Sequence, residues 1–166
     1  MRTDHKKLID EIDALEKRYE AAKDLFSFKE VKKHFNILIY ESNKTDAENI
    51  LSVLHKNNIR RLVLRKRGDN WLDDITVYSP KLILISMSLR TKSGFEIVRE
   101  IVHYEEFEHI PIIMLSKDAT EVEASWAIRC GAKAMVKKPV NNDYLFIEIL
   151  TKILRSTMFY SFDYDL

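Results

Sequence analysis

The stretch KLILISMSLRTKSGFE, residues 81–96, carries the pattern that decides the fold. The consecutive apolar residues Leu82–Ile85 are typical of a buried strand, and they run directly into Ser86. A polar segment follows, after which Gly94 and Phe95 begin a helical pattern. An open α/β sheet places its reactive groups at the carboxyl ends of its strands, so Ser86 stands where a reactive side chain is expected.

The same alternation of strand and helix extends over most of the chain. Five apolar strands alternating with five helices imply a parallel sheet that is covered by helices on both faces. The pattern alone leaves several doubly wound folds open. The predicted strands are 36–42, 61–67, 81–86, 110–116 and 132–138, and the predicted helices are 45–58, 69–79, 93–104, 119–130 and 141–157.

The composition excludes several classes of protein. The chain has 166 residues, of which 46% are hydrophobic and 32% are charged, and this indicates a folded domain. A net charge of +1 argues against bulk nucleic-acid binding and against a membrane surface. The three glycines are far apart, so neither a P-loop nor a dinucleotide fingerprint can be written with them. A single cysteine and a charged N-terminus predict a cytoplasmic protein without a signal peptide.

Residues 1–34 follow a different pattern, in which apolar residues recur alternately four and three positions apart. This heptad stripe predicts an N-terminal coiled-coil helix, which we expect to form the seam of a homodimer. The stripe can also pack on its own domain, and the sequence leaves that alternative open. Residues 27–30 have the spacing of a capping box, which predicts a short second helix. The predicted dimer seam consists of Leu8, Ile12, Leu15, Tyr19, Ala22 and Phe26.

Four motifs at matching intervals over residues 35–157 resemble the receiver domain of bacterial response regulators, the CheY-like superfamily. SPKLILIS resembles the strand that ends in the phospho-accepting aspartate, and SGFE places Gly94 at the family's glycine. IPIIMLS ends in the family's Ser or Thr at Ser116, and GAKAMVKKP ends in its Lys-Pro, with the lysine at Lys138. The resemblance implies a flavodoxin-like, five-stranded parallel sheet of strand order 2-1-3-4-5.

The resemblance also shows that most of the family's reactive side chains are replaced in this chain. Two acidic residues hold magnesium in the family, where this chain has Glu41 and Ser42. Ser86 replaces the phosphorylated aspartate, and Met135 replaces the aromatic switch residue. Phosphoryl transfer needs an ionised carboxylate as nucleophile and a metal ion that neutralises the phosphoryl oxygens. We therefore predict a degenerate phospho-acceptor pocket with no metal and no cofactor, formed by Glu41, Ser42, Ser86, Ser116 and Lys138, in which Glu41 and Lys138 pair.

Apolar residues outside the predicted core indicate a surface for a protein partner. Helix 141–157 is apolar on nearly every face, although the sheet of a receiver covers only one. Trp126 stands at a position that is usually polar in the family, and tryptophan is a common anchor of interfaces. The predicted partner face consists of Val122, Trp126, Phe146 and Leu150, and residues 158–166 form an aromatic and acidic C-terminal tail.

Together these features predict a non-catalytic signalling adaptor in a bacterial two-component system. We expect a pseudo-receiver that acts without phosphorylation, forms a homodimer and binds an unidentified signalling protein, with no membrane and no nucleic acid. Two alternatives remain: a sensor that binds a small ligand or nucleotide in the cleft at the strand ends, and an active phospho-acceptor that uses a displaced residue such as Asp118. The basic run at residues 60–67 is more typical of a protected edge strand than of a nucleic-acid site.

Overall fold

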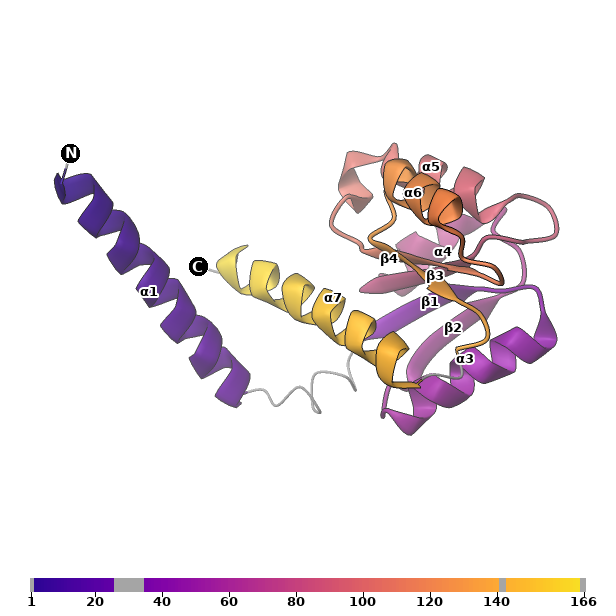
Figure 1. The fold of residues 1–166 in the computed structure, drawn as a ribbon, viewed down its shortest axis with the longest axis horizontal. Coiled ribbons are helices and arrows are strands. Elements are labelled where there is room, and N and C mark those ends of the chain that lie inside the picture. Colours follow the sequence, from indigo (N-terminus) through magenta and orange to yellow (C-terminus); the bar gives the residue numbers. More distant parts are fainter. Residues whose placement is uncertain (1, 26–34, 141–142, 165–166) are drawn as a thin grey trace. The chain divides into compact units, whose positions relative to one another are not determined.

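The computed structural model describes residues 2–25, 35–140 and 143–164, and Figure 1 shows their helices and strands. The chain divides into two compact units, Met1–His34 and Phe35–Leu166. None of the helices within the described ranges combines the length and the hydropathy that a membrane span requires.

The first unit contains one described helix, α1 (Arg2–Leu25). Two residues of its apolar stripe, Leu8 and Ile12, are exposed at 55% and 47%, and Leu15 is partly buried. Residues 26–34, with the last residue of the predicted seam and the predicted second helix, lie outside the described residues. Within this unit, Leu8 and Ile12 are therefore not covered by other residues of the helix.

The second unit is built on a parallel sheet of the predicted order, β2-β1-β3-β4-β5. The register pairs Ile37 with Leu82 and Ser86 with Leu115. The side chains of paired residues point to the same face of the sheet. Because all strands run the same way, their carboxyl ends meet at one edge of the sheet. The strands are β1 (Asn36–Tyr40), β2 (Arg61–Arg65), β3 (Leu82–Ser86), β4 (Ile112–Ser116) and β5 (Ala134–Lys137).

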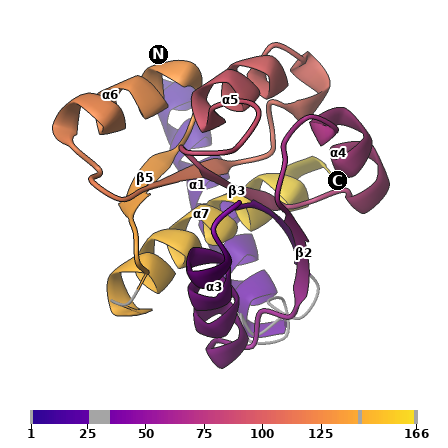
Figure 2. The ribbon, with the colours of Figure 1, turned by 90° about the vertical axis from the view of Figure 1, so that its right-hand side faces the viewer.

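Helices cover both faces of this sheet, as Figure 2 shows. Every residue of β3 and β4 is buried, which explains why both strands are continuously apolar up to their final serines. Helices α3 (Lys44–Lys56) and α7 (Asp143–Tyr164) lie on one face, and α4 (Trp71–Tyr78), α5 (Gly94–Val102) and α6 (Glu121–Cys130) lie on the other. A short 3-10 helix, Glu105–Phe107, follows α5.

Local sequence fixes where these helices begin and end. Polar side chains accept hydrogen bonds from backbone N–H groups of the first turn, which would otherwise have no partner. Gly131 ends α6 with φ of 114°, a conformation that favours glycine, as the sequence predicts. The capping residues are Asn43 for α3, Ser93 for α5 and Thr120 for α6.

Gly94 brings the start of α5 directly against the end of β3. Its backbone N–H donates to the carbonyl of Met87 over 2.9 Å. A side chain at this position would collide with the backbone carbonyl of Ser86, so only glycine allows this close approach. The family glycine therefore shapes the backbone around Ser86.

Helix α7 differs from its prediction in length and in exposure. It continues well past residue 157, so most of the predicted tail at 158–166 extends the helix. Phe146 and Leu150 are exposed at 1% and 0%, and their inclusion in the partner face is therefore wrong. Their spacing of four places them on one stripe, which is buried in the second unit, whereas Leu145 is 51% exposed.

Candidate functional site at the carboxyl ends of the strands

Four of the predicted pocket residues meet at one edge of the sheet. Glu41 directly follows β1, Ser86 and Ser116 end β3 and β4, and Lys138 directly follows β5. All four are buried, with exposed fractions from 0% for Ser86 to 5% for Lys138. A buried ammonium group needs partners that offset its desolvation, so the contacts of Lys138 define the site.

Lys138 connects three different elements through its ammonium group. Nζ donates a hydrogen bond of 2.8 Å to Glu41 Oε1, which confirms the predicted ion pair. Nζ also donates to Ser86 Oγ over 2.8 Å. A third contact, 3.2 Å from Nζ to Asp46 Oδ2, is an ion pair without hydrogen-bond geometry. The ammonium group thus ties β1 and β3 to the first turn of α3.

Asp46 is a residue of this site that the sequence analysis did not identify. Its backbone N–H donates to Asn43 Oδ1 over 3.0 Å, and its side chain is 14% exposed. The short connection between β1 and α3 was the available signal. Because α3 begins at Lys44, an acidic residue in its first turn must lie close to Glu41 at the end of β1.

Two carboxylates share a single ammonium group in this site. Glu41 Oε2 and Asp46 Oδ2 are both buried, and neither accepts a hydrogen bond from any residue that the structure describes. Burial raises the pKa of the Glu41 carboxyl above its ordinary value. Lys138 and Ser86 oppose this rise, and the neighbouring Asp46 adds to it. Glu41 therefore holds a proton more readily than an exposed glutamate does.

Ser86 is arranged as a hydrogen-bonding group rather than as a nucleophile. Its Oγ accepts a hydrogen bond from Lys138 and donates to the carbonyl of Ser88 over 3.4 Å. An activated serine needs a general base that takes its proton, and a backbone carbonyl cannot do this. In this geometry the Ser86 hydroxyl donates its proton to a backbone carbonyl and accepts from an ammonium group.

The hydroxyls of two of the five predicted pocket residues, Ser42 and Ser116, form their hydrogen bonds away from Lys138. Ser42 Oγ donates to the carbonyl of Lys66 over 3.0 Å, just beyond β2. Ser116 Oγ donates to Glu123 Oε2 over 2.6 Å and accepts from the backbone N–H of Ala119. The structure therefore does not bring either hydroxyl to Lys138. Met135, the predicted switch position, is partly buried and packs against the core beneath α4, α5 and α6.

A comparison with protein-family models identifies the family to which this part of the chain belongs. A model of the response regulator receiver domain matches residues 37–150, well over half of the chain. The chain belongs to the response regulator receiver family. The receiver thus begins within β1 and extends into α7, and α1 lies outside the matched region.

Two similar proteins are covered over most of their length by this receiver. PilH of Pseudomonas aeruginosa is 25% identical over 109 residues, which are 66% of this chain and 89% of that protein. DivK of Brucella ovis is 24% identical over 106 residues, or 64% of this chain and 85% of that protein.

Other relatives are much longer than the receiver. Hybrid signal transduction histidine kinase M of Dictyostelium discoideum is 30% identical over 124 residues, which are 71% of this chain but 5% of that protein. An uncharacterized 76.5 kDa protein of Thiocystis violacea is 28% identical over 115 residues, or 69% of this chain and 16% of that protein. The chain therefore spans a small part of these two relatives.

Solved structures show the same fold. A putative response regulator from Chloroflexus aurantiacus has a TM-score of 0.67 at 19% identity, covering 72% of this chain and 97% of that one. The chemotaxis response regulator CheY4 of Vibrio cholerae has a TM-score of 0.64 at 16% identity, covering 72% of this chain and 98% of that one. At such identities the likeness concerns the fold alone.

Two residues of the predicted partner face are exposed on the receiver. Val122 and Trp126, one turn apart on α6, have exposed fractions of 62% and 56%. The ring of Trp126 packs edge-to-face against Phe95 of α5, with ring centroids 6.3 Å apart. This contact leaves more than half of Trp126 in contact with water.

The basic run lies at an edge of the sheet, as predicted, because β2 is the first strand in the order. Arg65 Nε lies 3.3 Å from Asp74 Oδ1 of α4, and its guanidinium group stacks over the ring of Tyr78. Tyr40 OH donates to Asp74 Oδ2 over 2.8 Å, and burial raises the pKa of Tyr40. Arg65 therefore stabilises the packing of α4 on the receiver, while Arg60, Arg61, Lys66 and Arg67 are exposed.

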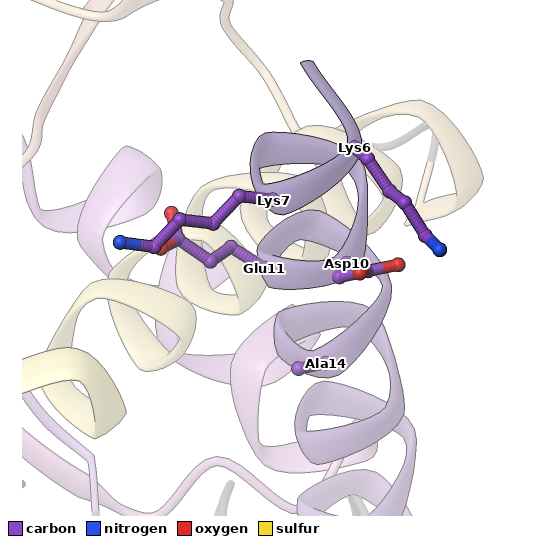
Figure 3. Close-up of a pocket in the computed structure, with 5 residues that line it drawn as sticks. All are labelled: Lys6, Lys7, Asp10, Glu11 and Ala14. Atoms are coloured by element: carbon purple, nitrogen blue, oxygen red, sulfur yellow. The ribbon is translucent and has the colours of Figure 1, made fainter. Parts of the chain in front are cut away.

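A shallow pocket lies on α1, outside the receiver. Its lining residues all belong to this helix, and Lys7 and Glu11 extend together to one side of it (Figure 3). Lys6 and Asp10 extend to another side, so charges of both signs surround the depression. The side chains of one helix do not enclose a ligand, and we assign no binding site there.

Proposed function

We propose that the protein is a pseudo-receiver, a non-catalytic and cytoplasmic signalling adaptor that works without phosphorylation and forms a homodimer through α1. The observation that carries the proposal is the buried Ser86 hydroxyl at the end of β3, which accepts a hydrogen bond from Lys138. It stands where the resemblance to receivers places the phospho-accepting carboxylate.

The residues at the strand ends do not fit the magnesium ion that the family implies. Magnesium is bound through one or two carboxylates together with phosphate oxygens and water. Here the ammonium group of Lys138 already lies against both carboxylates, those of Glu41 and Asp46, and would repel a divalent cation. Within the described ranges, no three His, Cys, Asp or Glu side chains are placed to hold a metal ion.

The nucleophile is missing as well. A receiver takes the phosphoryl group on an ionised carboxylate, and β3 ends in Ser86. The Ser86 hydroxyl is hydrogen-bonded to an ammonium group, which lowers the electron density on its oxygen further. Loss of the nucleophile and loss of the metal site are separate defects, and both support a function without phosphorylation.

The exposed surface of α6 supports the role of adaptor. Tryptophan is costly to expose and is strongly enriched among residues that anchor interfaces. Trp126 and Val122 together form a small apolar patch on α6. We propose that this patch binds the signalling partner.

Phosphorylation tests the first part of the proposal. The full chain is incubated with acetyl phosphate and Mg²⁺, and its intact mass is measured; we expect no adduct. Beryllofluoride with Mg²⁺ should not raise the melting temperature. The variant Ser42→Asp/Ser86→Asp restores both lost carboxylates and serves as the comparison. A stoichiometric adduct on the wild type overturns the proposal, and its loss in Asp118→Asn would identify a displaced phospho-acceptor.

Partner capture tests the second part. The wild-type chain, Trp126→Ala and Val77→Ala are used as baits in the same native lysate. Val77 is 72% exposed on α4, so its substitution is a matched loss of exposed apolar surface. We expect Val77→Ala to retain the partner of the wild type and Trp126→Ala to lose it. Equal capture by both variants would exclude Trp126 as the anchor.

A further inference from the structure

Charged residues border the apolar stripe of α1, and their order distinguishes between the two ways in which two copies can pair. Leu8 and Leu15 occupy d positions of the heptad, and Ile12 occupies an a position. In a two-stranded coiled coil the e and g positions flank this core and set the orientation of the helices. The g positions are Glu11 and Arg18, and the e positions of the following heptads are Glu16 and Lys23.

A parallel pair brings like charges together along both borders. In that arrangement each g residue lies beside the e residue five positions further along the other helix. Glu11 would face Glu16 of the partner subunit, and Arg18 would face Lys23 of the partner subunit. Two-fold symmetry repeats each contact on the opposite border. Like-charged pairs at such positions destabilise the assembly.

An antiparallel pair brings opposite charges together at the g positions near the middle of the helix, and its like-charged e pair, Arg2 with Lys23 of the partner subunit, falls at the ends of the seam. When two copies of α1 (Arg2–Leu25) overlap along their full length, Ile12 lies opposite Leu15 of the partner subunit. In the same register the g positions face each other, so Glu11 lies beside Arg18 of the partner subunit. Symmetry repeats this pair as well. The register of greatest overlap is thus also the register in which these charges attract.

The structure supports an interface on this side of the helix. Leu8 and Ile12 are about half exposed on α1, and an apolar stripe on a helix is normally buried against another element. Glu11 and Arg18 are exposed, so their side chains are accessible to a second helix. Glu11 extends away from Asp10, as Figure 3 shows.

We infer that two copies of the chain pair through α1 in antiparallel orientation, with Glu11 of each copy beside Arg18 of the other. The inference rests on the proposed homodimer and adds its geometry. The carboxyl ends of the two paired helices then lie at opposite ends of the seam. For a helix of 24 residues this separation is about 36 Å.

Charge reversal tests the orientation, because the two arrangements predict effects of opposite sign. The dissociation constant of the full-chain dimer is measured by sedimentation equilibrium. In the antiparallel pair, Glu11→Lys places lysine beside Arg18 of the partner subunit and should weaken the dimer roughly tenfold. In a parallel pair the same lysine would face Glu16 of the partner subunit and strengthen the dimer. Asp10→Lys, the same charge change at an outer position, is the control and should have little effect.

Disulfide trapping provides a second readout. Cys130, the single cysteine, is first replaced by serine, and Leu8→Cys and Tyr19→Cys are made separately in that background. We expect a linked dimer when the two variants are mixed and none from either variant alone. Two results would overturn the antiparallel orientation while the homodimer remains. One is a disulfide-linked dimer from Leu8→Cys alone, and the other is a Glu11→Lys dimer whose dissociation constant is lower than that of the wild type or equal to it. A wild-type monomer overturns the homodimer itself.

Discussion

Lys138 Nζ and Ser86 Oγ lie 2.8 Å apart at the carboxyl edge of the sheet. In a phosphorylated receiver a carboxylate stands at the end of this strand and carries the reaction. The serine leaves the lysine to neutralise two other carboxylates, those of Glu41 and Asp46. The pocket is therefore a buried ionic cluster with one positive and two negative groups, and its energetics can be measured.

The pair of Lys138 and Glu41 should be strongly coupled. Removing one partner of a buried ion pair leaves the other charge uncompensated, so Lys138→Met should cost about 3–5 kcal/mol of unfolding free energy. Adding Glu41→Gln removes one of the abandoned charges, and the double variant should be more stable than Lys138→Met alone. Urea unfolding of the wild type and the three variants completes the cycle.

A matched control comes from an exposed pair in the same unit. Lys92 Nζ lies 2.6 Å from Glu100 Oε1, and both side chains are more than a third exposed. Solvent screens such a pair, so Lys92→Met should change the unfolding free energy little. Additive effects of Lys138→Met and Glu41→Gln would show that these two residues are not coupled.

The raised pKa of Glu41 should make part of the stability depend on pH. The native state binds the Glu41 proton more tightly than the unfolded state does, whose pKa is near the ordinary value of 4.5. The stabilisation from this proton is fully present below that value and is lost as the pH rises through the native pKa. The wild type should therefore lose stability relative to Glu41→Gln as the pH rises above about 4.5.

Urea unfolding at a series of pH values measures this difference. Asp46→Asn removes the neighbouring carboxylate that helps to raise the pKa of Glu41, so it should move the loss of stability to lower pH. If the difference in unfolding free energy between the wild type and Glu41→Gln is constant with pH, or changes with pH in the opposite direction, the pKa of Glu41 is not raised in the native state.

The α1 seam should open when a charge is placed in its core. Leu15→Lys puts an ammonium group from each helix into a buried layer, at a cost of several kcal/mol that is comparable to the stability of so short a coiled coil. Light scattering of the full chain at micromolar concentration should show a monomer. The receiver has its own core and should keep its far-ultraviolet circular dichroism.

Ala14→Lys is the matched control for this change. Ala14 is exposed and lies outside the seam positions, so the added charge should leave the dimer intact. A Leu15→Lys variant that stays fully dimeric would place the interface elsewhere on the chain.

The two tryptophans should differ in their contributions to stability. Trp71 is 6% exposed, and its Nε1 donates to Glu100 Oε2 over 2.7 Å. Trp71→Phe loses this charge-assisted hydrogen bond and should cost about 1–3 kcal/mol. Trp126→Phe, at a position 56% exposed, should cost less than about 0.5 kcal/mol.

Fluorescence gives an independent check on the same pair of variants. With Trp126 replaced, the emission from Trp71 should resist quenching by iodide, whereas Trp126 in the Trp71→Phe variant should be quenched readily. Equal quenching of both residues would mean that their surroundings do not differ as described.

The sequence by itself determined the type and order of the elements of the receiver. Strand and helix periodicities are local, so NILIY, LILIS and IIMLS already identify buried strands, and Gly131 identifies the end of a helix. The motifs around Ser86 and Lys138 resemble those of receivers, and this resemblance indicated the order of the strands. A buried lysine needs a counter-charge, and this requirement indicated that Lys138 pairs with Glu41.

Only the tertiary structure decided which polar groups meet and which apolar faces are covered. Asp46 reaches Lys138 because α3 starts next to the end of β1, while Ser116 is drawn to Glu123 at the start of α6. A local pattern gives the face of a helix but not what packs on it. For that reason the apolar residues of α7 looked like a partner face in the sequence, and the fold buries Phe146 and Leu150 within the receiver.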